Sequence, residues 1–269
     1  MEKIKKISGD GFKALGVLYL LIRIGDYYFP HYDFNDPCWF FAVVILSIIY
    51  VLWESTPYSQ INISLPSTIS KLKIKFGDIF EGDGLIVIPV NEFFDSEIGG
   101  GYVSENSLHG KFILQILNGD SVRFNGLVDE SLKDLSPPFI KRTGGRRRRY
   151  PIGTVVKMDI NGIRYLLVAL SRTDTTTLKA SATLEELITC LQRLWEAVRN
   201  YSEGACVKVP LIGSGLSGVG LPYQDLIHIT RTSLLEATKE KQVTDEIILV
   251  INPIHKAEID LNLIKERWL

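Results

Sequence analysis

The stretch 209-VPLIGSGLSGVGLP-222 places four glycines and two serines directly after an apolar run. Glycine loses more backbone freedom on folding than any other residue, so a dense cluster of it needs a reason. One interpretation is a tight structural turn, and the other is a loop whose bare backbone approaches a ligand. Features elsewhere in the chain bear on this choice.

A second glycine-rich stretch, 98-IGGGYVSEN-106, follows the apolar run 84-GLIVIPVN-91. In α/β sheets ligands bind at the carboxyl ends of strands, which is where both stretches are expected. Glycine amides at such a place can donate to phosphate oxygens with no side chain in the way. The letters of 213-GSGLSG-218 match GxGxxG, but the match lies far from a first strand, and GxxxxGK[ST] does not occur, so neither nucleotide loop is predicted.

From about residue 57 onward, runs rich in Val, Ile and Leu alternate with helical patterns, which predicts a mixed α/β sandwich. Asn161 and Gly162 join two of these runs and predict a β-hairpin. Thr183 and Glu186 have the spacing of a capping box and predict the start of a helix. The expected strands are 60–65, 72–77, 84–90, 154–160, 164–170, 205–212 and 246–251, and the expected helices are 183–200, 222–239 and 257–268.

The composition excludes several classes of protein. With 269 residues, 46% of them hydrophobic, the chain has enough apolar material for a core and is not generally disordered. A net charge of -1 argues against nucleic acid as the main partner. The three cysteines and four histidines show no ligand spacing, so we expect no disulfide framework and no metal centre.

Two apolar segments near the start predict a transmembrane hairpin. Residues 38–53, CWFFAVVILSIIYVLW, carry no charge and have aromatic residues at both ends, whereas 14-ALGVLYLLI-22 is shorter and bounded by charges. The connection 26–37 is acidic and lysines precede the first segment, so the positive-inside rule places both chain ends in the cytoplasm. The expected parts are a transmembrane hairpin over 1–56 and a cytoplasmic domain over 57–269. A buried hydrophobic hairpin is the alternative.

The stretch 141-KRTGGRRRRY-150 contains six cationic residues, among them Arg146 to Arg149. We expect a solvated loop there, and contact with anionic lipid is the second interpretation. His109 has no partner at a recognisable spacing, so we expect it on the surface or in packing.

The ligand-loop interpretation becomes more specific when the motifs are taken in order. GDI at 77–79, an apolar strand ending in Asn91, the glycines 99–101 and a later strand ending in 213–218 resemble the macro domain, a family that binds ADP-ribose and its derivatives. The resemblance covers about 72–253. It implies a macro-domain-like mixed sheet sandwiched by helices.

The resemblance also implies a role for each matching residue. Asp78 would accept a hydrogen bond from the adenine amine with Ile79 beside it, and Asn91 would address the distal ribose. The first glycine loop, Gly99, Gly100 and Gly101, would pack under the distal ribose and diphosphate. The diphosphate would be cradled by Ser214, Gly215, Leu216, Ser217 and Gly218. A carboxylate suits an amine donor, and glycine amides suit a diphosphate.

Two departures from the family pattern favour binding without hydrolysis. The strand end 87-VIPVN-91 lacks the earlier asparagine and the small alanines of hydrolytic relatives, and 103-VSENSLHGKF-112 lacks their alanine-rich helix. We therefore predict no catalytic residue, no cofactor and no enzyme activity. A membrane-anchored ADP-ribosyl hydrolase is the alternative, and a tethered scaffold with purely structural glycine loops is the third possibility.

A membrane hairpin followed by a macro-like domain resembles the effector family of type II Thoeris anti-phage defence. That resemblance implies a TIR-domain partner that consumes NAD and makes a nucleotide second messenger, histidine-linked ADP-ribose. It implies a homo-oligomer, contact with membrane lipid, disruption of the membrane in abortive infection and a multi-pass location in the bacterial inner membrane.

Overall fold

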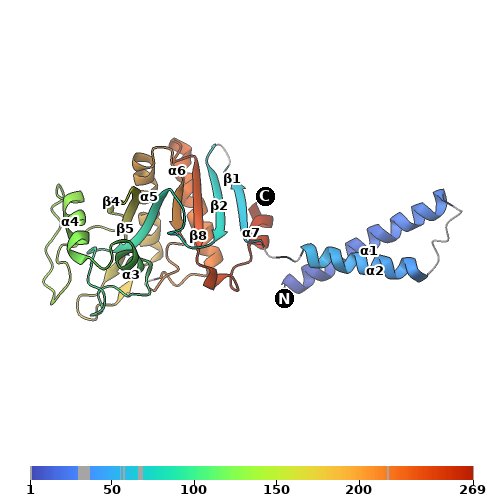
Figure 1. Ribbon diagram of the computed structural model, residues 1–269, viewed down its shortest axis with the longest axis horizontal. Helices are drawn as coiled ribbons and strands as arrows, with labels where there is room; N and C mark the ends of the chain where they lie inside the picture. The colour runs from blue at the N-terminus through green and yellow to red at the C-terminus, as the bar shows by residue number, and fades with distance from the viewer. Residues whose placement is uncertain are drawn as a thin grey trace. The chain divides into compact units, whose positions relative to one another are not determined.

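The computed structural model describes residues 2–29, 37–54, 56, 58–65, 69–216 and 218–268. The chain divides into two compact units, Met1–Tyr58 and Ser59–Leu269. The first unit is helical, and the second contains a mixed sheet with helices (Figure 1).

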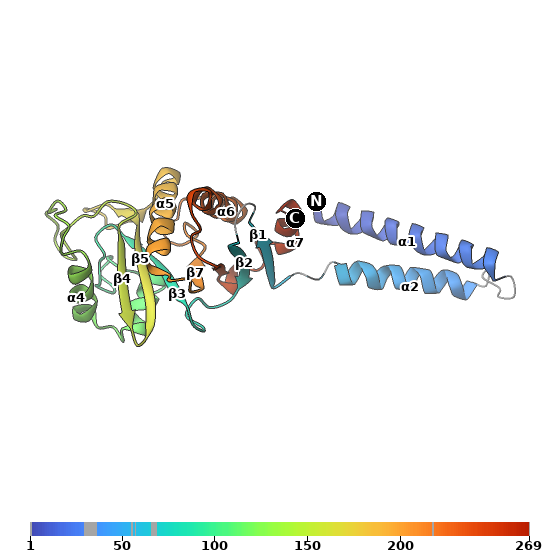
Figure 2. The same ribbon diagram turned by 90° about the horizontal axis from the view of Figure 1, so that it is seen from above.

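The first unit is a pair of packed helices, α1 (Glu2–Tyr28) and α2 (Pro37–Glu54). They lie side by side in both ribbon views (Figures 1 and 2). Large apolar side chains remain exposed along both helices, including Phe12 and Trp53. Residues 30–36, which hold most of the predicted acidic connection, lie outside the described residues.

The predicted membrane crossing by these helices is wrong. Among the residues that the structure describes, no helix is both long enough and apolar enough to cross a membrane. The 18 residues of α2 extend for about 27 Å at about 1.5 Å per residue, which is less than a hydrocarbon core of about 30 Å. Helix α1 is longer, but Lys13, Arg23 and Asp26 interrupt its apolar sequence. The transmembrane hairpin over 1–56 and the multi-pass location in the bacterial inner membrane, with the topology derived for it, are corrected accordingly.

The second unit is built on a mixed sheet with the strand order β1-β2-β8-β7-β3-β5-β4. Strands β2, β8, β7, β3 and β5 run parallel, and β1 and β4 pair antiparallel with their neighbours. The strands are β1 (Gln60–Ser64), β2 (Lys71–Phe76), β3 (Leu85–Asn91), β4 (Val155–Ile160), β5 (Ile163–Thr173), β7 (Val207–Pro210) and β8 (Glu246–Ile251), with the short β6 (Ala180–Ser181) paired to β5. The predicted mixed α/β fold is confirmed.

The predicted hairpin between β4 and β5 is also confirmed. Its turn residues, Asn161 and Gly162, have φ values of 52° and 80°. A two-residue turn that matches the twist of its strands needs positive φ at both positions, which Asn-Gly supplies. The turn sets the register in which Ile160 lies opposite Ile163.

Side chains alternate along β5, so the sheet carries an apolar core on each face. Leu166 and Val168 belong to the core on the α5–α6 face, and Leu167 and Ala169 belong to the core on the α3–α4 face (Figure 2). The helices are α3 (Leu108–Lys111), the π-helix η1 (Phe112–Ile116), α4 (Ser121–Ser131), α5 (Leu184–Tyr201), α6 (Tyr223–Glu240), the 3-10 helix η2 (Pro253–His255) and α7 (Leu261–Trp268).

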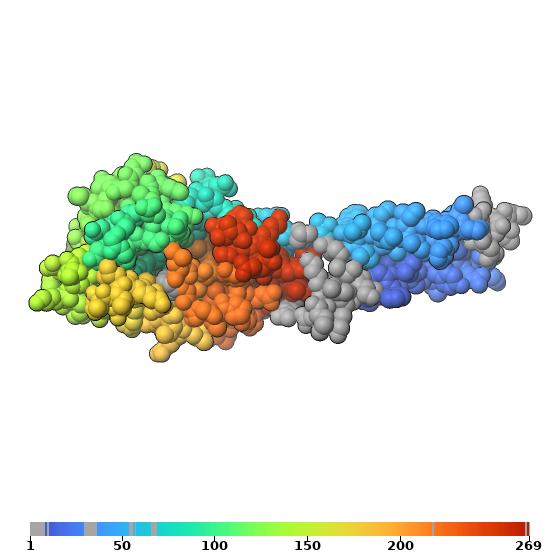
Figure 3. All heavy atoms as spheres, turned by 90° about the horizontal axis from the view of Figure 1, so that it is seen from below, coloured from blue at the N-terminus to red at the C-terminus, as the bar shows by residue number. Residues whose placement is uncertain are grey.

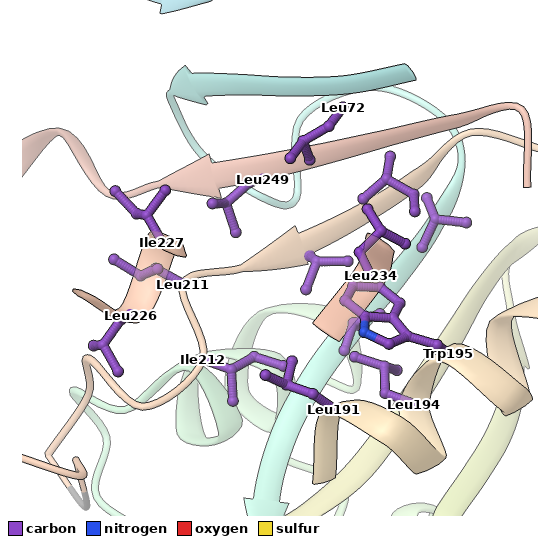
Figure 4. Close-up of a cluster of buried hydrophobic side chains, with 14 of the residues drawn as sticks. Leu72, Leu191, Leu194, Trp195, Leu211, Ile212, Leu226, Ile227, Leu234 and Leu249 are labelled. Atoms are coloured by element: carbon purple, nitrogen blue, oxygen red, sulfur yellow. The ribbon is translucent and has the colours of Figure 1, made fainter. Parts of the chain in front are cut away.

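The core on the α5–α6 face is arranged around Trp195, which is fully buried (Figure 4). Its indole N–H donates to Ser233 Oγ on α6 over 3.0 Å, so the one polar atom of the ring is satisfied. At the start of α5, the Thr183 hydroxyl accepts from the Glu186 N–H and the Glu186 carboxylate accepts from the Thr183 N–H. The predicted capping box is confirmed.

The sequence pattern does not predict the helical segments between 108 and 131. Helix α4 buries only two side chains, Phe124 and Val128, and it has Gly126 between them. A helix with so narrow an apolar stripe gives little 3.6-residue periodicity.

Candidate functional site

The segments predicted to bind a ligand follow parallel strands at one edge of the sheet. Asp78 follows β2, Asn91 ends β3 and leads to the first glycine loop at 98–101, and β7 leads to the second glycine loop at 211–220. Because these strands are parallel, their carboxyl ends meet at the same edge. Figure 3 shows chain segments far apart in the sequence, coloured green, yellow, orange and red, adjoining on one face of this unit.

The order along this edge has a chemical meaning. Strand β7 neighbours β3, and β8 separates β7 from β2. With about 4.8 Å between neighbouring strands, the ends of β2 and β3 are about 14 Å apart, with the end of β7 between them. Asp78, the second glycine loop and the first glycine loop therefore follow one another in the order of an adenine, a diphosphate and a distal ribose.

Asp78 lies exposed in a fixed turn at the end of β2. Its Oδ1 accepts the backbone N–H of Phe80 over 3.0 Å, and the Gly77 N–H donates to the Ile251 carbonyl over 3.0 Å. Ile79 is buried in the core on the α3–α4 face. The turn thus presents a carboxylate that can accept from an amine, while Ile79 anchors it; both roles toward a ligand stay predictions.

Asn91 is buried and organises the end of β3. Its Oδ1 accepts the backbone N–H groups of Phe93 and Asp95 over 3.1 and 3.2 Å. Its Nδ2 donates to Asp95 Oδ2 over 3.0 Å. A distal ribose would have to share this amide with Asp95, and the predicted ribose contact of Asn91 stays a prediction.

The first glycine loop needs glycine for its own conformation. Gly99, Gly100 and Gly101 have φ values of 82°, 57° and 88°, a region that other residues rarely enter. The Gly99 N–H donates to the Val103 carbonyl and the Tyr102 N–H donates to the Gly99 carbonyl, each over 3.2 Å. The loop is a closed, exposed turn, and its shape alone does not decide whether it binds a ligand.

The second glycine loop contains glycines of two kinds. A Cβ on Gly218 would meet the carbonyl oxygens of Gly213 and Gly215 at 2.7 Å, so glycine there is structural. Gly215 is exposed, has no left-handed φ, and a Cβ on it would meet no atom within 4 Å among the described residues. Within the described chain, neither backbone strain nor a steric contact accounts for glycine at 215.

The other predicted residues of this loop differ in how the fold uses them. Ser214 Oγ donates to the Leu211 carbonyl over 2.5 Å and closes the start of the turn. Leu216, between Gly215 and Ser217 in the sequence, has a side chain that is 72% exposed. Ser217 lies outside the described residues. The predicted cradle stays a prediction for all five residues from 214 to 218.

The basic segment 141–150 is only partly the solvated loop that the sequence predicts, because Lys141, Arg147 and Arg148 are exposed but Arg142 is not. The side chain of Arg142 is fully buried, and its Nη2 donates to Asp95 Oδ2 over 3.0 Å. Its guanidinium lies 4.2 Å from the ring centroid of Phe93 and 5.0 Å from that of Tyr102. Arg142 therefore cannot reach a membrane surface, whereas contact of the exposed Lys141, Arg147 and Arg148 with anionic lipid stays a prediction.

Further cations of this segment are paired with acidic residues from earlier elements. The Arg146 N–H donates to Asp95 Oδ1 over 2.8 Å, and its guanidinium lies 2.6 Å from Asp129. Arg149 Nε lies 3.1 Å from Glu92, which is almost fully buried, and burial raises the pKa of the Glu92 carboxyl. The partners lie far from the segment in sequence, so a single arginine run gave no signal of them.

His109 is a packing residue of the core on the α3–α4 face. Its ring lies 5.5 Å from that of Phe124, and burial lowers the pKa of the imidazole to about 3, so it is neutral. Within the described parts of the chain, no group of three or more His, Cys, Asp or Glu side chains is placed to hold a metal ion. The predicted site residues thus comprise the exposed carboxylate of Asp78 and the exposed glycines of the two loops, and their roles toward a ligand stay predictions.

Comparison with known proteins identifies the family of the chain. A family model described as Thoeris protein ThsA, Macro domain, matches residues 72–252. The Thoeris protein ThsA of Bacillus amyloliquefaciens (strain Y2) is 28% identical over 240 residues, covering 84% of this chain and 75% of that protein.

Solved structures bear on the fold. The Oceanobacillus iheyensis macrodomain with MES bound aligns with a TM-score of 0.53 and 14% identity, covering 77% of this chain and 97% of that one. The Oceanobacillus iheyensis macrodomain with ADP aligns with a TM-score of 0.51 and 14% identity over 77% of this chain and 97% of that one. At such identity the likeness establishes the fold alone, and the predicted macro-domain-like fold is confirmed.

Proposed function

The chain belongs to the Thoeris ThsA macro-domain family, and we propose that its second unit is a sensor that binds an ADP-ribose-derived nucleotide without turning it over. The single observation that carries the proposal is the environment of Gly215. Neither backbone strain nor a described neighbour requires glycine there, and its exposed backbone after a parallel strand is open to the approach of another molecule.

The proposed ligand lies along the carboxyl edge of the sheet. Asp78 accepts from the adenine amine, the second glycine loop receives the diphosphate, and the first glycine loop lies under the distal ribose. The exposed side chain of Leu216 would cover the diphosphate from outside. Backbone amides are suitable partners here, because they bind an anion without adding a charge of their own.

Substitution of Asp78 tests this orientation. Asp78→Ala should weaken ADP-ribose binding by about tenfold, the effect of about 1.4 kcal/mol, because a hydrogen bond from the adenine amine is lost. Asp83→Ala is the matched control, since Asp83 is an exposed carboxylate of the same connection between β2 and β3. Titration calorimetry on the full chain measures both, and equal affinities for the two variants would contradict the proposed orientation.

The second candidate is an ADP-ribosyl hydrolase, and the use of Asn91 speaks against it. The amide of Asn91 is engaged with Asp95, and His109 is buried against Phe124, so neither side chain is presented to a ligand at the edge of the sheet. We expect no release of ADP-ribose from ADP-ribosylated protein by the wild-type chain. Steady turnover that disappears in Asn91→Ala would favour the hydrolase.

The source of the signal follows from the type II Thoeris resemblance. We propose that a TIR-domain partner makes it from NAD and that histidine-linked ADP-ribose is the preferred form. Competition titrations of ADP-ribose against its histidine conjugate decide the point, with tighter binding of the conjugate expected.

We propose that the bound signal changes how copies of the chain associate. A ligand can shift such an equilibrium only through different affinity for the two states, so the signal should bind the associated state more tightly. The exposed apolar side chains of α1 and α2 offer a surface for a second copy. Sedimentation velocity with and without ligand measures the change, and an unaltered mass would contradict it.

A further inference from the structure

Two buried cations each hold a segment that carries residues of the proposed site. Lys208 is on β7 beneath the connection from β2 to β3, and Arg142 is in the basic segment beside the first glycine loop. The roles carried over from the macro domain include neither residue.

Lys208 holds the connection that carries Asp78, at the part that leads into β3. It is only 3% exposed, and its Nζ donates to the carbonyl oxygens of Glu81 and Gly82 over 2.7 and 2.6 Å. The connection 77–84 that carries Asp78 contains neither helix nor strand, so few of its carbonyls have a regular partner. Two hydrogen bonds from one ammonium therefore fix the part of the connection that follows Asp78.

Arg142 is the anchor at the distal-ribose end. It is paired with Asp95, whose other contacts are the Asn91 amide and the Arg146 N–H. The guanidinium also lies over the ring of Tyr102, the residue directly after the first glycine loop. One buried cation thus joins the end of β3, the first glycine loop and the basic segment.

Two glycines after Arg142 allow the basic segment to pack against Asp95 and Tyr102. A Cβ on Gly145 would meet Asp95 Oδ1 at 2.5 Å and Arg142 Nη2 at 2.6 Å, and a Cβ on Gly144 would clash with Tyr102 Oη. Both glycines are therefore needed for the basic segment to lie against Tyr102.

We propose that Lys208 and Arg142 are positioning residues for opposite ends of one nucleotide site, Lys208 for the adenine end and Arg142 for the distal-ribose end. This inference rests on the proposed function. It means that the two ends of the site can be weakened separately, because each is held by its own buried cation.

Comparing ADP with ADP-ribose tests the proposal, since ADP has the adenine and the diphosphate but no distal ribose. In full-length Arg142→Met, affinity for ADP-ribose should fall about tenfold more than affinity for ADP, because the first glycine loop is no longer held against the ribose. In Lys208→Met, both affinities should fall by about tenfold, since each ligand uses the Asp78 end. Arg193→Met, at a side chain 63% exposed on α5, is the control for loss of a cation and should change neither affinity.

A loss of fold would imitate a loss of binding, so each variant has a milder companion. Gly144→Ala leaves every charge in place and displaces Tyr102, and it should lower the ratio of ADP-ribose to ADP affinity as Arg142→Met does. Gly82→Ala strains a backbone with a φ of 74° next to the Lys208 contacts, and it should weaken both ligands together. Urea midpoints accompany every titration.

Failure of the proposed function and failure of the positioning roles give different results. A wild-type chain that binds neither ligand overturns the proposed function, and this inference with it. A wild-type chain that binds ADP-ribose, with an unchanged affinity ratio in Arg142→Met and Gly144→Ala and unchanged affinities in Lys208→Met and Gly82→Ala, overturns the positioning roles and leaves the proposed function standing. Equal wild-type affinity for ADP and ADP-ribose overturns the role of Arg142.

Discussion

Asp95 and Arg142 form an ion pair 3.0 Å apart, and both side chains are fully excluded from solvent. Removing one member leaves the other charge buried and unpaired, which is destabilising by about 3–5 kcal/mol. We therefore expect Asp95→Ala to lower the free energy of unfolding of the second unit by about that amount, as measured by urea denaturation.

Two controls define what the pair contributes. Asp159→Ala removes a carboxylate that is 59% exposed and 3.4 Å from Lys157, and it should have a much smaller effect. The double variant Asp95→Leu/Arg142→Met removes both charges and should be more stable than Asp95→Ala. If Asp95→Ala unfolds at the wild-type urea concentration, the pair has no structural importance.

The two kinds of glycine in the second loop predict opposite results. Gly215→Val should keep the wild-type urea midpoint, because no atom of the described residues outside its chain neighbours lies within 4 Å of a Cβ there. It should weaken ADP-ribose binding at least about tenfold by filling the ligand's space. Gly218→Ala should lower the midpoint, because its Cβ would meet two carbonyl oxygens at 2.7 Å. A Gly215→Val variant that is destabilised yet binds normally would show that the loop is only a turn.

His109 predicts a pH dependence of stability. Burial lowers its pKa to about 3 from an ordinary value of 6.5, so the folded state holds the neutral form. A base with a lowered pKa contributes stability that is present above about pH 6.5 and is lost as the pH falls toward 3. Between pH 6.5 and pH 3, the free energy of unfolding of the wild type should fall by up to about 1.4 kcal/mol per pH unit more than that of His109→Leu. Parallel stability curves for the two proteins between pH 7 and pH 4 would contradict this.

The capping box of α5 offers a test of the fold apart from the site. Thr183→Ala removes the hydroxyl that accepts from the Glu186 N–H, and it should lower the free energy of unfolding by about 1 kcal/mol. Thr189→Ala is the control within the same helix, because the Thr189 hydroxyl only donates back to the Glu185 carbonyl. Equal losses for the two variants would mean that the cap is not stabilising.

Local chemistry made parts of the fold predictable from sequence. Asn161-Gly162 carries its turn type in two residues, and the Thr183 cap lies three residues from its partner. The order of motifs from Asp78 to Gly218 also gave the fold family. The turn and the cap depend on residues that are close in sequence, and the family depends on the order of motifs. Both can be read from a single sequence.

Features that depend on distant partners were not predictable. The burial of Arg142 depends on Asp95, 47 residues earlier, and on two aromatic rings, so an arginine-rich run reads as solvated. The apolar run of α2 reads as a membrane span, although its length falls short of one. The hydrogen bond from the Asn91 amide to Asp95 is seen only in the structure.

The central claim is that the carboxyl edge of the sheet binds an ADP-ribose-type nucleotide. Titration calorimetry of the full-length chain with ADP-ribose tests it most directly. The account predicts saturable binding with one nucleotide per chain, weakened at least about tenfold in Gly215→Val and unchanged in Arg193→Met. Absence of binding by the folded wild-type chain, or equal binding by Gly215→Val, would contradict it.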